Sequence, residues 1–379
     1  MVQFISETTL SVTDDRMNES LTTNNTDQAG CPLPQLTFFR AASQLLAYSA
    51  IFILSMFGNC VLINAITRNY GRCSAAMNYY IINMAAADLV TTVFDIGVQV
   101  YHYAVMAMNK QFEWFDGVMG VFLCKWFAFT QGTAIACSVL TLTAIAINRF
   151  QAVMFPFRPS MRTSRALLVI GLIWISSFAI ASPMLYAMRV LNSHGALYCL
   201  EDWEPLFDNQ SSRGHYSLVL LFFLYVCPLV LIGLLYSLIA LKVWVRTAPG
   251  QITAPHQLNE TKRKKKILKI CMTVVSVFAV CWLPFYVYLI LNFLGDGNNG
   301  CGTPEYVAFI GLFFGHANSA LNPFIYIIYN SDYQKSLKKV LLHCCCHWKS
   351  DRVRMRTIRS SLESIPSLRT FKELELTSL

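Results

Sequence analysis

The chain has 379 residues, of which 55% are hydrophobic and only 13% charged, and its formal net charge is +9. Soluble domains carry about 25% charged residues, so this composition excludes an ordinary soluble protein. The sequence contains no HExxH motif, no GxSxG motif and no phosphate-binding loop, so none of the enzyme classes that these motifs mark is indicated. We therefore expect a membrane protein that is not an enzyme.

The membrane spans are marked by stretches without Asp, Glu, Lys or Arg. About 20 apolar residues in a helix cross roughly 30 Å of hydrocarbon, and long continuous runs favour helices over barrel strands. A further apolar segment, about 77–105, is interrupted by Asp88 and Asp95. The charge-free runs are 41–67, 126–148, 166–188, 214–241, 270–295 and 306–331. We predict an all-α seven-transmembrane helix bundle over residues 41–329.

The orientation of the bundle follows from its basic residues, which concentrate in cytoplasmic loops of membrane proteins. With the N-terminus outside, most Lys and Arg residues fall in the inner loops and in the C-terminal tail. The basic run "KRKKK" (262–266) is then a helix end at the anionic inner leaflet rather than a nuclear signal. We expect a multi-pass protein of the plasma membrane with an extracellular N-terminus and a cytoplasmic C-terminus, and no nucleic-acid partner.

Both ends of the chain differ from the bundle. Residues 1–40 are polar and form an extracellular N-terminal tail. Apolar residues at helical spacing in 330–343, alternating with lysines, predict a short amphipathic helix on the membrane surface. The cytoplasmic tail, 344–379, begins with Cys344, Cys345 and Cys346, which suit palmitoylation, whereas zinc binding with His343 and His347 is the alternative.

Further modifications and partners are predicted from short signals. Sequons on the outer side predict glycosylation of Asn18, Asn24 and Asn209. Four outer cysteines, Cys31, Cys124, Cys199 and Cys301, allow three disulfide pairings, among which spacing does not choose. The terminal "TSL" fits a PDZ ligand. Phosphorylation of the tail would create an arrestin site, and the candidate positions are Thr357, Ser360, Ser361, Ser364 and Ser367.

Polar residues occur inside the predicted spans, where they are costly and usually functional. Asp88, Asp95 and His102 recur every seven residues and so share one helix face. Similar depths are predicted for Asn59, Ser138, Asn318, Ser319 and Asn322. These residues predict one polar chamber, and a hydrogen-bond network that only ties the helices together is the alternative. Arg149, at the inner end of the third span, is read on its own as a guanidinium that reaches the headgroups.

A set of motifs occurs in a fixed order and in separate spans, and together they indicate a known family. The marks are Gly58 with Asn59, "AAADL" with Asp88, Cys124, Arg149, Trp174, Cys199, Pro228, Tyr236, "FAVCWLP" (278–284) and "NPFIY" (322–326). Together they resemble the rhodopsin-like (class A) G-protein-coupled receptors over about residues 42–345. The resemblance implies a receptor that binds an extracellular ligand and activates heterotrimeric G proteins.

The resemblance also implies roles for individual residues. Cys124 and Cys199 resemble the disulfide that pins the outer loop to the third helix, which leaves Cys31 with Cys301 as a second pair. No cofactor is required, but Asp88, Ser138, Asn318 and Asn322 resemble a cluster that binds sodium. Pro284 and Pro323 interrupt regular helix and offer hinges. The residues expected to rearrange on activation are Arg149, Tyr236, Phe278, Trp282, Pro284, Pro323 and Tyr326.

One position departs from the family pattern. The family usually has an acid immediately before the arginine, and here Asn148 stands in its place, while lysines occupy the start of the sixth helix. The ionic restraint on Arg149 is therefore expected to be weak, which predicts raised basal signalling. Phe150 also replaces the usual tyrosine.

Residues missing from the third and seventh spans exclude two classes of ligand. The seventh span has no lysine for a retinal Schiff base, and His316 lies near that place. The third span has no acid for an amine, and Gln131 there resembles neuropeptide receptors. The acidic loop "LYCLEDWEP" (197–205) resembles that of receptors for amidated peptides of the RFamide and neuropeptide Y types, and would attract a cationic ligand. The predicted contacts are Asp95, Gln99, His102, Gln131, Glu201, Asp202, Glu204, Tyr286, Leu289 and His316.

Two alternatives remain from the sequence. A lipid or another small molecule is the second candidate ligand. A transporter or channel is the rival class, because Asp88 and Asp95 could mark an ion path.

Overall fold

The structure is a computed structural model that describes residues 38–68, 75–110, 112–155, 157, 161–193, 195–245, 255–295, 305–329, 334 and 337. The chain divides into two units, 1–329 and 330–379, and the elements below all belong to the first. Several predictions lie outside the described residues. They concern Asn18, Asn24, Cys31, Cys301, most of 330–343, the lipidated Cys344–Cys346, the tail phosphorylation sites and the terminal "TSL".

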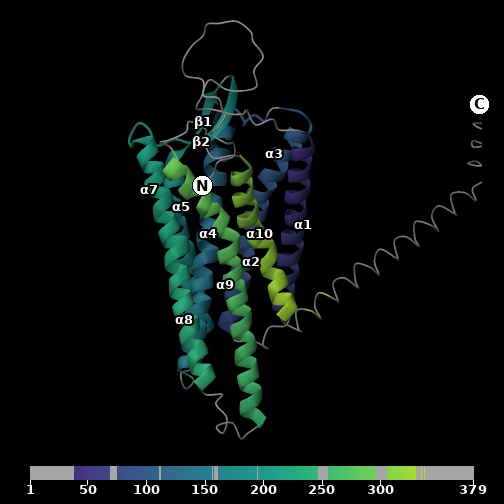
Figure 1. The fold of residues 1–379 in the computed structure, drawn as a ribbon, viewed down its shortest axis with the longest axis vertical. Coiled ribbons are helices and arrows are strands. Elements are labelled where there is room, and N and C mark those ends of the chain that lie inside the picture. The colour runs from purple at the N-terminus through teal and green to yellow at the C-terminus, as the bar shows by residue number, and fades with distance from the viewer. Residues whose placement is uncertain are drawn as a thin grey trace, which may run out of the picture. The chain divides into compact units, whose positions relative to one another are not determined.

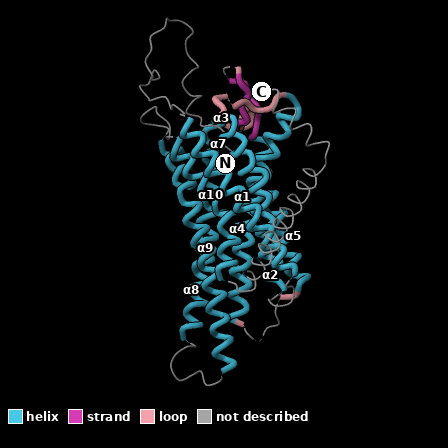
Figure 2. The backbone as a smooth tube through the Cα atoms, turned by 90° about the vertical axis from the view of Figure 1, so that its right-hand side faces the viewer, coloured by secondary structure: helices cyan, strands magenta, loops and turns pink. Residues whose placement is uncertain are grey.

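The helices lie side by side along one direction, and the short hairpin of strands lies at one end (Figures 1 and 2). We call this end the hairpin end and the opposite one the Arg149 end. Two π-helical turns, η2 and η3, interrupt the second and fifth spans. In chain order the helices are α1 (Phe38–Arg68), α2 (Ala75–Thr91), η2 (Thr92–Ile96), α3 (Gly97–Ala107), α4 (Gly117–Met154), α5 (Thr163–Ala181), α6 (Pro183–Ala187), α7 (Asn209–Leu221), η3 (Phe222–Val226), α8 (Cys227–Val245), α9 (Pro255–Gly295) and α10 (Glu305–Tyr329).

Among the described residues, six helical segments are long and apolar enough to cross a membrane. The seventh, α10, has 25 residues, which exceeds the roughly 20 that a crossing needs. It has no charged residue after Glu305, and its polar residues include His316, Asn318 and Asn322. These three side chains are buried inside the bundle. The predicted seven-helix bundle is confirmed.

The helices extend beyond the charge-free runs that predicted them. The third run was expected at 126–148, whereas α4 covers Gly117–Met154 and includes Lys125 and Arg149. A charge-free run marks only the hydrocarbon layer. Backbone hydrogen bonding continues past it, because long basic side chains can reach water while their stems stay on the helix.

The two π turns were not predicted. The Gly97 amide donates to the Thr92 carbonyl in η2, and the Cys227 amide donates to the Phe222 carbonyl in η3. The second turn precedes Pro228, whose missing amide and bulky ring disfavour a regular helix there, so the proline was its signal. No comparable signal precedes η2. The assumption of a regular helix through Asp95 was therefore incomplete, although Asp88 and Asp95 are both buried.

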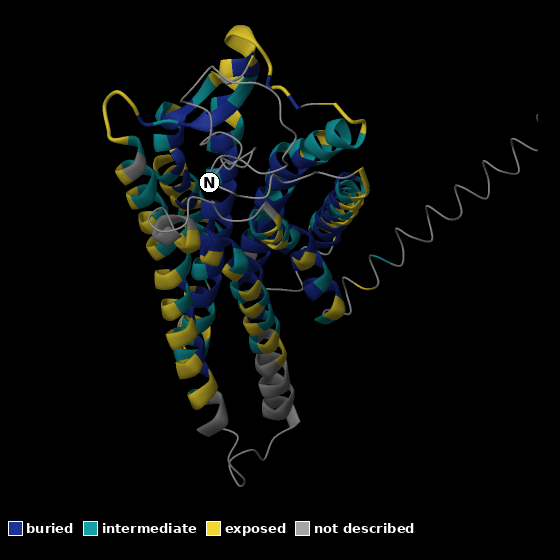
Figure 3. Cartoon of the chain, turned by 45° about the horizontal axis from the view of Figure 1, so that its top comes forward, coloured by how far each residue is buried: buried dark blue, intermediate teal, exposed yellow. Residues whose placement is uncertain are grey.

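The centre of the bundle is α4. Of its most apolar window, 78% is buried, against 22% for the span formed by α5 and α6. It contacts α2, α5, α8 and strand β1. Figure 3 shows the buried residues gathered on the inner faces of the helices.

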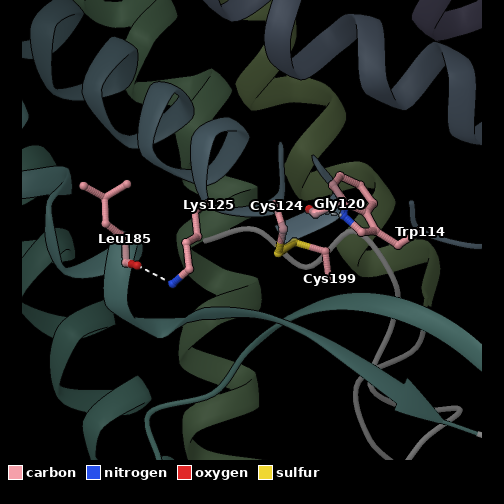
Figure 4. The surroundings of a disulfide bond; sticks show 6 residues. All are labelled: Trp114, Gly120, Cys124, Lys125, Leu185 and Cys199. Atoms are coloured by element: carbon pink, nitrogen blue, oxygen red, sulfur yellow. Dashed lines mark hydrogen bonds between the residues drawn. A yellow bond between two sulfur atoms is a disulfide. The ribbon is translucent and has the colours of Figure 1, made fainter. Parts of the chain in front are cut away.

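A disulfide attaches the hairpin to this central helix. Strands β1 (Met188–Ser193) and β2 (Ala196–Glu201) pair antiparallel, with Val190 opposite Cys199. Cys199 is bonded to Cys124 near the start of α4, with 5.6 Å between their Cα atoms (Figure 4). The indole of Trp114, whose backbone amide binds Leu197 of β2, donates to the Gly120 carbonyl at 2.9 Å. The Cys124–Cys199 pairing is thereby confirmed.

The helix that follows the hairpin begins at a side-chain cap. Asp208 precedes α7 and accepts a hydrogen bond from the Ser211 amide at 2.8 Å. Hydrogen bonds from Ser211 hold the pKa of the Asp208 carboxyl below its usual value. Asn209, the predicted glycosylation site, is the first residue of α7, and its Oδ1 accepts a hydrogen bond from the Trp203 amide at 3.3 Å.

The close approach of α1 to α10 depends on one glycine. A Cβ atom built on Gly58 would lie 2.7 Å from Cγ of Pro323. Both residues are buried, so neither can move into open space. The glycine that marked the family in the first span is therefore the contact surface for the proline of the seventh.

We expect Gly58→Ala to reduce the stability of the bundle by about 1–3 kcal/mol, because it overpacks a filled contact. The matched control is Gly233→Ala in α8, where an added Cβ meets nothing within 4 Å and alanine favours the helix by about 0.5–1 kcal/mol. Thermal unfolding of the purified variants measures both. Equal midpoints for the two variants would contradict the prediction.

Candidate functional site

A hydrogen bond between Asp88 and Asn322 joins α2 to α10. Asn322 Nδ2 donates to Asp88 Oδ2 at 3.0 Å, and the Ser319 side chain also hydrogen-bonds Asp88. Asp88 and Asn322 are about 2% exposed or less. A buried carboxylate needs such donors, because nothing else replaces its lost hydration.

Asn59 connects α1 to the same region. Its Nδ2 lies 3.0 Å from the Ser55 carbonyl and 3.1 Å from the Ser319 carbonyl. Ser55 Oγ lies 2.6 Å from the hydroxyl of Thr92, which donates to the Asp88 carbonyl. Of the polar residues predicted at this depth, Asn59, Ser319 and Asn322 join Asp88 in a network that spans α1, the second span and α10.

Several buried oxygen atoms in this region have no hydrogen-bond partner among the described residues. Asn59 Oδ1, Asn318 Oδ1 and Asn322 Oδ1 are buried without a hydrogen-bond partner among the described residues. Ser138, from α4, is buried as predicted. Buried amide oxygens of this kind and the Asp88 carboxylate are oxygen ligands of the type that hard cations prefer.

Asp95 lies on η2 and differs from Asp88 in its surroundings. It is 2% exposed, and neither carboxylate oxygen has a hydrogen-bond partner within the described part of the chain. Burying a carboxylate without partners is expensive. A buried acid without a partner among the described residues can accept one from a ligand, so Asp95 is the first candidate to contact a ligand.

A second polar connection crosses the bundle at His316 of α10. Its Nε2 lies 3.4 Å from Gln131 Nε2 of α4, and its Nδ1 lies 3.4 Å from the Tyr48 hydroxyl of α1. Gln131 Oε1 has no partner among the described residues. Gln131 and His316 line a small cavity together with Ile135, Trp282, Phe285 and Leu312.

The floor of this cavity is aromatic. Trp282 packs edge-on against Phe285 at 5.7 Å between ring centroids, and Phe278 and Tyr286 lie 6.3 Å from Trp282. A Cβ on Gly315 of α10 would lie 3.2 Å from the Trp282 ring. Movement of Trp282 is therefore coupled directly to α10, as a switch residue requires.

The three acidic residues of the outer loop differ in their contacts and in their exposure. Glu201 is buried and accepts a hydrogen bond from the Trp203 indole at 2.8 Å, and its backbone carbonyl accepts one from Arg213 at 2.6 Å. Asp202 lies 3.6 Å from the Arg189 guanidinium. Glu204 is exposed. Glu201 and Asp202 therefore make contacts within the protein, whereas Glu204 is the most accessible of the three acids.

The remaining residues predicted to contact the ligand differ in burial and in packing. Gln99 is buried, Leu289 is half-buried, and His102 packs against Phe112 at 4.8 Å with its Nδ1 unpartnered among the described residues. Sequence reasoning missed Tyr48, which is fully buried and packs against Tyr103, Phe309 and Phe313 as well as His316. Its place in the charge-free first span gave no signal of these contacts.

Three of the seven predicted switch residues, Arg149, Tyr236 and Tyr326, lie close to one another near the Arg149 end. The Tyr236 hydroxyl hydrogen-bonds the Cys271 thiol of α9, and Arg149 and Tyr326 are its electrostatic neighbours. Arg149 is half-buried, its Nε has no hydrogen-bond partner among the described residues, and Asn148 beside it is buried. Cys271 was not predicted as part of this group.

Comparison with known proteins agrees with this architecture. The family model for 7 transmembrane receptors of the rhodopsin family matches residues 58–326. The chain is 30% identical to the pyroglutamylated RF-amide peptide receptor of Rattus norvegicus, over 82% of this chain and 72% of that receptor. It is 29% identical to the QRFP-like peptide receptor of Branchiostoma floridae (87% and 86% covered) and 28% identical to the substance-P receptor of Aquarana catesbeiana (85% and 76%).

A seven-helix bundle of apolar, membrane-length segments is the architecture of the 7 transmembrane receptors whose family model matches this chain. The chain belongs to the rhodopsin family of seven-transmembrane receptors. It is therefore a receptor of the G-protein-coupled class and not an enzyme.

The two buried acids should respond oppositely to removal of their charge. Asp88→Ala leaves Asn322 Nδ2 without its partner and should cost about 1–3 kcal/mol of stability. Asp95→Asn replaces an unpartnered carboxylate with a neutral amide and should raise the unfolding midpoint or leave it unchanged. Thermal unfolding of the ligand-free protein distinguishes them. A loss for Asp95→Asn as large as that for Asp88→Ala would show that Asp95 already has a structural partner.

Proposed function

We propose that this protein is a plasma-membrane receptor for an extracellular peptide that carries an arginine and an amidated end, and that it activates heterotrimeric G proteins. The hairpin end would face outside, where the Cys124–Cys199 disulfide is chemically stable. The names of the RF-amide and substance-P relatives support a peptide ligand.

The observation that carries this proposal is the buried carboxyl group of Asp95, which has no hydrogen-bond partner among the described residues. A guanidinium matches a carboxylate in geometry and charge, and charge-assisted hydrogen bonds are about twice as strong as neutral ones. Gln131 Oε1, also unpartnered among the described residues, would accept an N–H from a terminal amide. An arginine followed closely by an amidated end supplies both groups.

The outer loop would act earlier in binding. Glu204 is exposed and Asp202 is partly exposed, so their charges would attract a cationic peptide before it enters the bundle. Glu201 would act through Trp203 by keeping the loop in shape, because its carboxylate is already bonded to the indole. In this proposal the acids of the loop attract the peptide, and Asp95 binds its arginine.

A lipid or other small molecule is the alternative ligand. The cavity lined by Gln131 and His316 has mostly apolar walls, from Ile135, Trp282, Phe285 and Leu312, but its volume of about 10 Å³ holds no more than about one water molecule. Transport or ion conduction is the rival activity. Ligand-driven nucleotide exchange on a purified G protein, measured beside ion flux in liposomes, separates receptor from transporter.

The Asp88 cluster is proposed to hold a sodium ion. Its carboxylate, the buried Ser138 and the unpartnered amide oxygens of Asn318 and Asn322 fit a small hard cation. The ion would neutralise Asp88 and occupy space between α2 and α10. Rearrangement of the Asn322–Asp88 hydrogen bond would then depend on whether the ion is present.

The Arg149 end is proposed to contact the G protein. Arg149, Tyr236 and Tyr326 lie at that end with Cys271, and a ligand that shifts Trp282 would act on them through α9 and α10. Arrestin, a PDZ protein and membrane lipid remain proposed partners of the tail, which lies beyond the described residues.

Asp95→Asn should reduce the potency of an arginine-containing amidated peptide by roughly 10- to 100-fold, since a hydrogen bond to a charged group contributes about 1.5–3 kcal/mol. A citrulline analogue should be less potent than the arginine peptide on the unmodified receptor. On the Asp95→Asn variant the two peptides should have nearly the same potency. This double-mutant cycle isolates the pair.

Glu204→Gln is the control, because this acid is exposed, and it should change potency only a few-fold. The measurement is peptide-stimulated nucleotide exchange in cells that express each variant at equal surface levels. If Asp95→Asn reduces the potencies of the arginine and citrulline peptides by the same factor, Asp95 does not pair with the arginine.

Asn148→Asp should lower basal nucleotide exchange, because an acid beside Arg149 restores an ionic restraint on the guanidinium. Asn148→Gln keeps the position neutral and serves as the control. Exchange is measured on purified protein without ligand. Basal exchange that stays level or rises in Asn148→Asp, relative to Asn148→Gln, would contradict the proposed role.

A further inference from the structure

A groove of about 760 Å³ lies between α9 and α10, on a side of the bundle that the ligand chamber does not use. Its middle and far parts are lined mostly by apolar side chains from both helices. Several of them are turned outward, and Val280 is 67% exposed. Its walls include Met272, Ser276, Val280, Phe314, Ala317 and Leu321.

Polar and charged groups are concentrated at one end of this groove. Lys269 Nζ lies 5.6 Å from the centroid of the Tyr329 ring, and the Thr273 hydroxyl lies 3.5 Å from the Tyr329 hydroxyl. Lys266 is exposed one turn earlier on α9, on the same side of the helix as Lys269. This is the Arg149 end, so the charge lies where α9 leaves the hydrocarbon.

The length of the groove matches one leaflet. From Lys269 to Val280 the helix advances eleven residues, or about 16 Å at 1.5 Å per residue. Half of the roughly 30 Å hydrocarbon layer is about 15 Å. A hydrocarbon chain attached at the level of Lys269 would therefore end near Val280 and Phe314.

From this arrangement we infer that the groove binds an anionic phospholipid of the leaflet at the Arg149 end. One acyl chain lies between α9 and α10, and the phosphate is held by Lys269 and Lys266. The pair of lysines selects this occupant over a sterol, because a sterol hydroxyl carries no charge to complement them. The inference does not depend on the identity of the outer ligand.

The site joins the two helices that carry the switch. Trp282 and Pro284 belong to α9, and Asn322 and Pro323 belong to α10. The Lys269–Tyr329 contact crosses between them at the mouth of the groove. A lipid that touches both helices has an affinity that depends on their separation, so it must in turn bias that separation.

The test is photochemical labelling of the full chain in phosphatidylcholine nanodiscs. These contain a trace of phosphatidylglycerol or phosphatidylcholine with the same diazirine-bearing acyl chain. We expect phosphatidylglycerol to label 268–281 and 314–321 at least roughly fivefold more, the effect of one lysine near anionic lipid. Lys269→Gln should remove most of this preference.

Two further variants complete the test. Arg165→Gln removes another exposed charge near the start of α5 and should leave the preference unchanged. Ser276→Phe fills the groove from an exposed position and should reduce labelling of both segments without a change in elution volume. The proposal is overturned if the two phospholipids label equally, if Lys269→Gln has no effect, or if a photoreactive sterol displaces phosphatidylglycerol from both segments.

Discussion

The hydrogen bond from Asn322 to Asp88 is the interaction on which the rest of the bundle depends. In hydrocarbon, no water can replace a missing partner, so the polar residues of α10 must face inward and find donors or acceptors on other helices. Asn322 does so on the second span, and Asn59 of α1 reaches the Ser319 carbonyl. The position of α10 against α1 and α2 follows from satisfying these groups, and Gly58 provides the room.

The chamber shows two ways of treating a buried acid. Asp88 is bonded within the protein, whereas Asp95 has no partner among the described residues although it is equally buried. The first arrangement stabilises the fold, and the second leaves interaction energy available to a ligand. A receptor needs both, because a bundle whose polar groups were all paired internally would gain little from binding.

The proposed ligand contacts Gln131 and His316 and the proposed switch residue Trp282 are connected through packing. Gln131 and His316 contact the same small cavity as Trp282, and Trp282 touches Gly315 of α10. Nearer the Arg149 end, Tyr236, Cys271 and Arg149 meet between α4, α8 and α9. The groove between α9 and α10 opens on the same two helices, so lipid and ligand would act on one mechanical element from different sides.

The sequence by itself determined the number of spans and their helical form. This is because hydrocarbon forces each spanning segment to satisfy its own backbone, so apolar length alone predicts a helix. The family motifs added the disulfide between Cys124 and Cys199. Only the tertiary structure decided that Asn322 donates to Asp88, that Asp95 has no hydrogen-bond partner among the described residues, that Trp203 donates to Glu201, and that η2 interrupts the second span. Partners such as Asn322 and Asp88 lie 234 residues apart, and no local pattern determines which side chains meet across that distance.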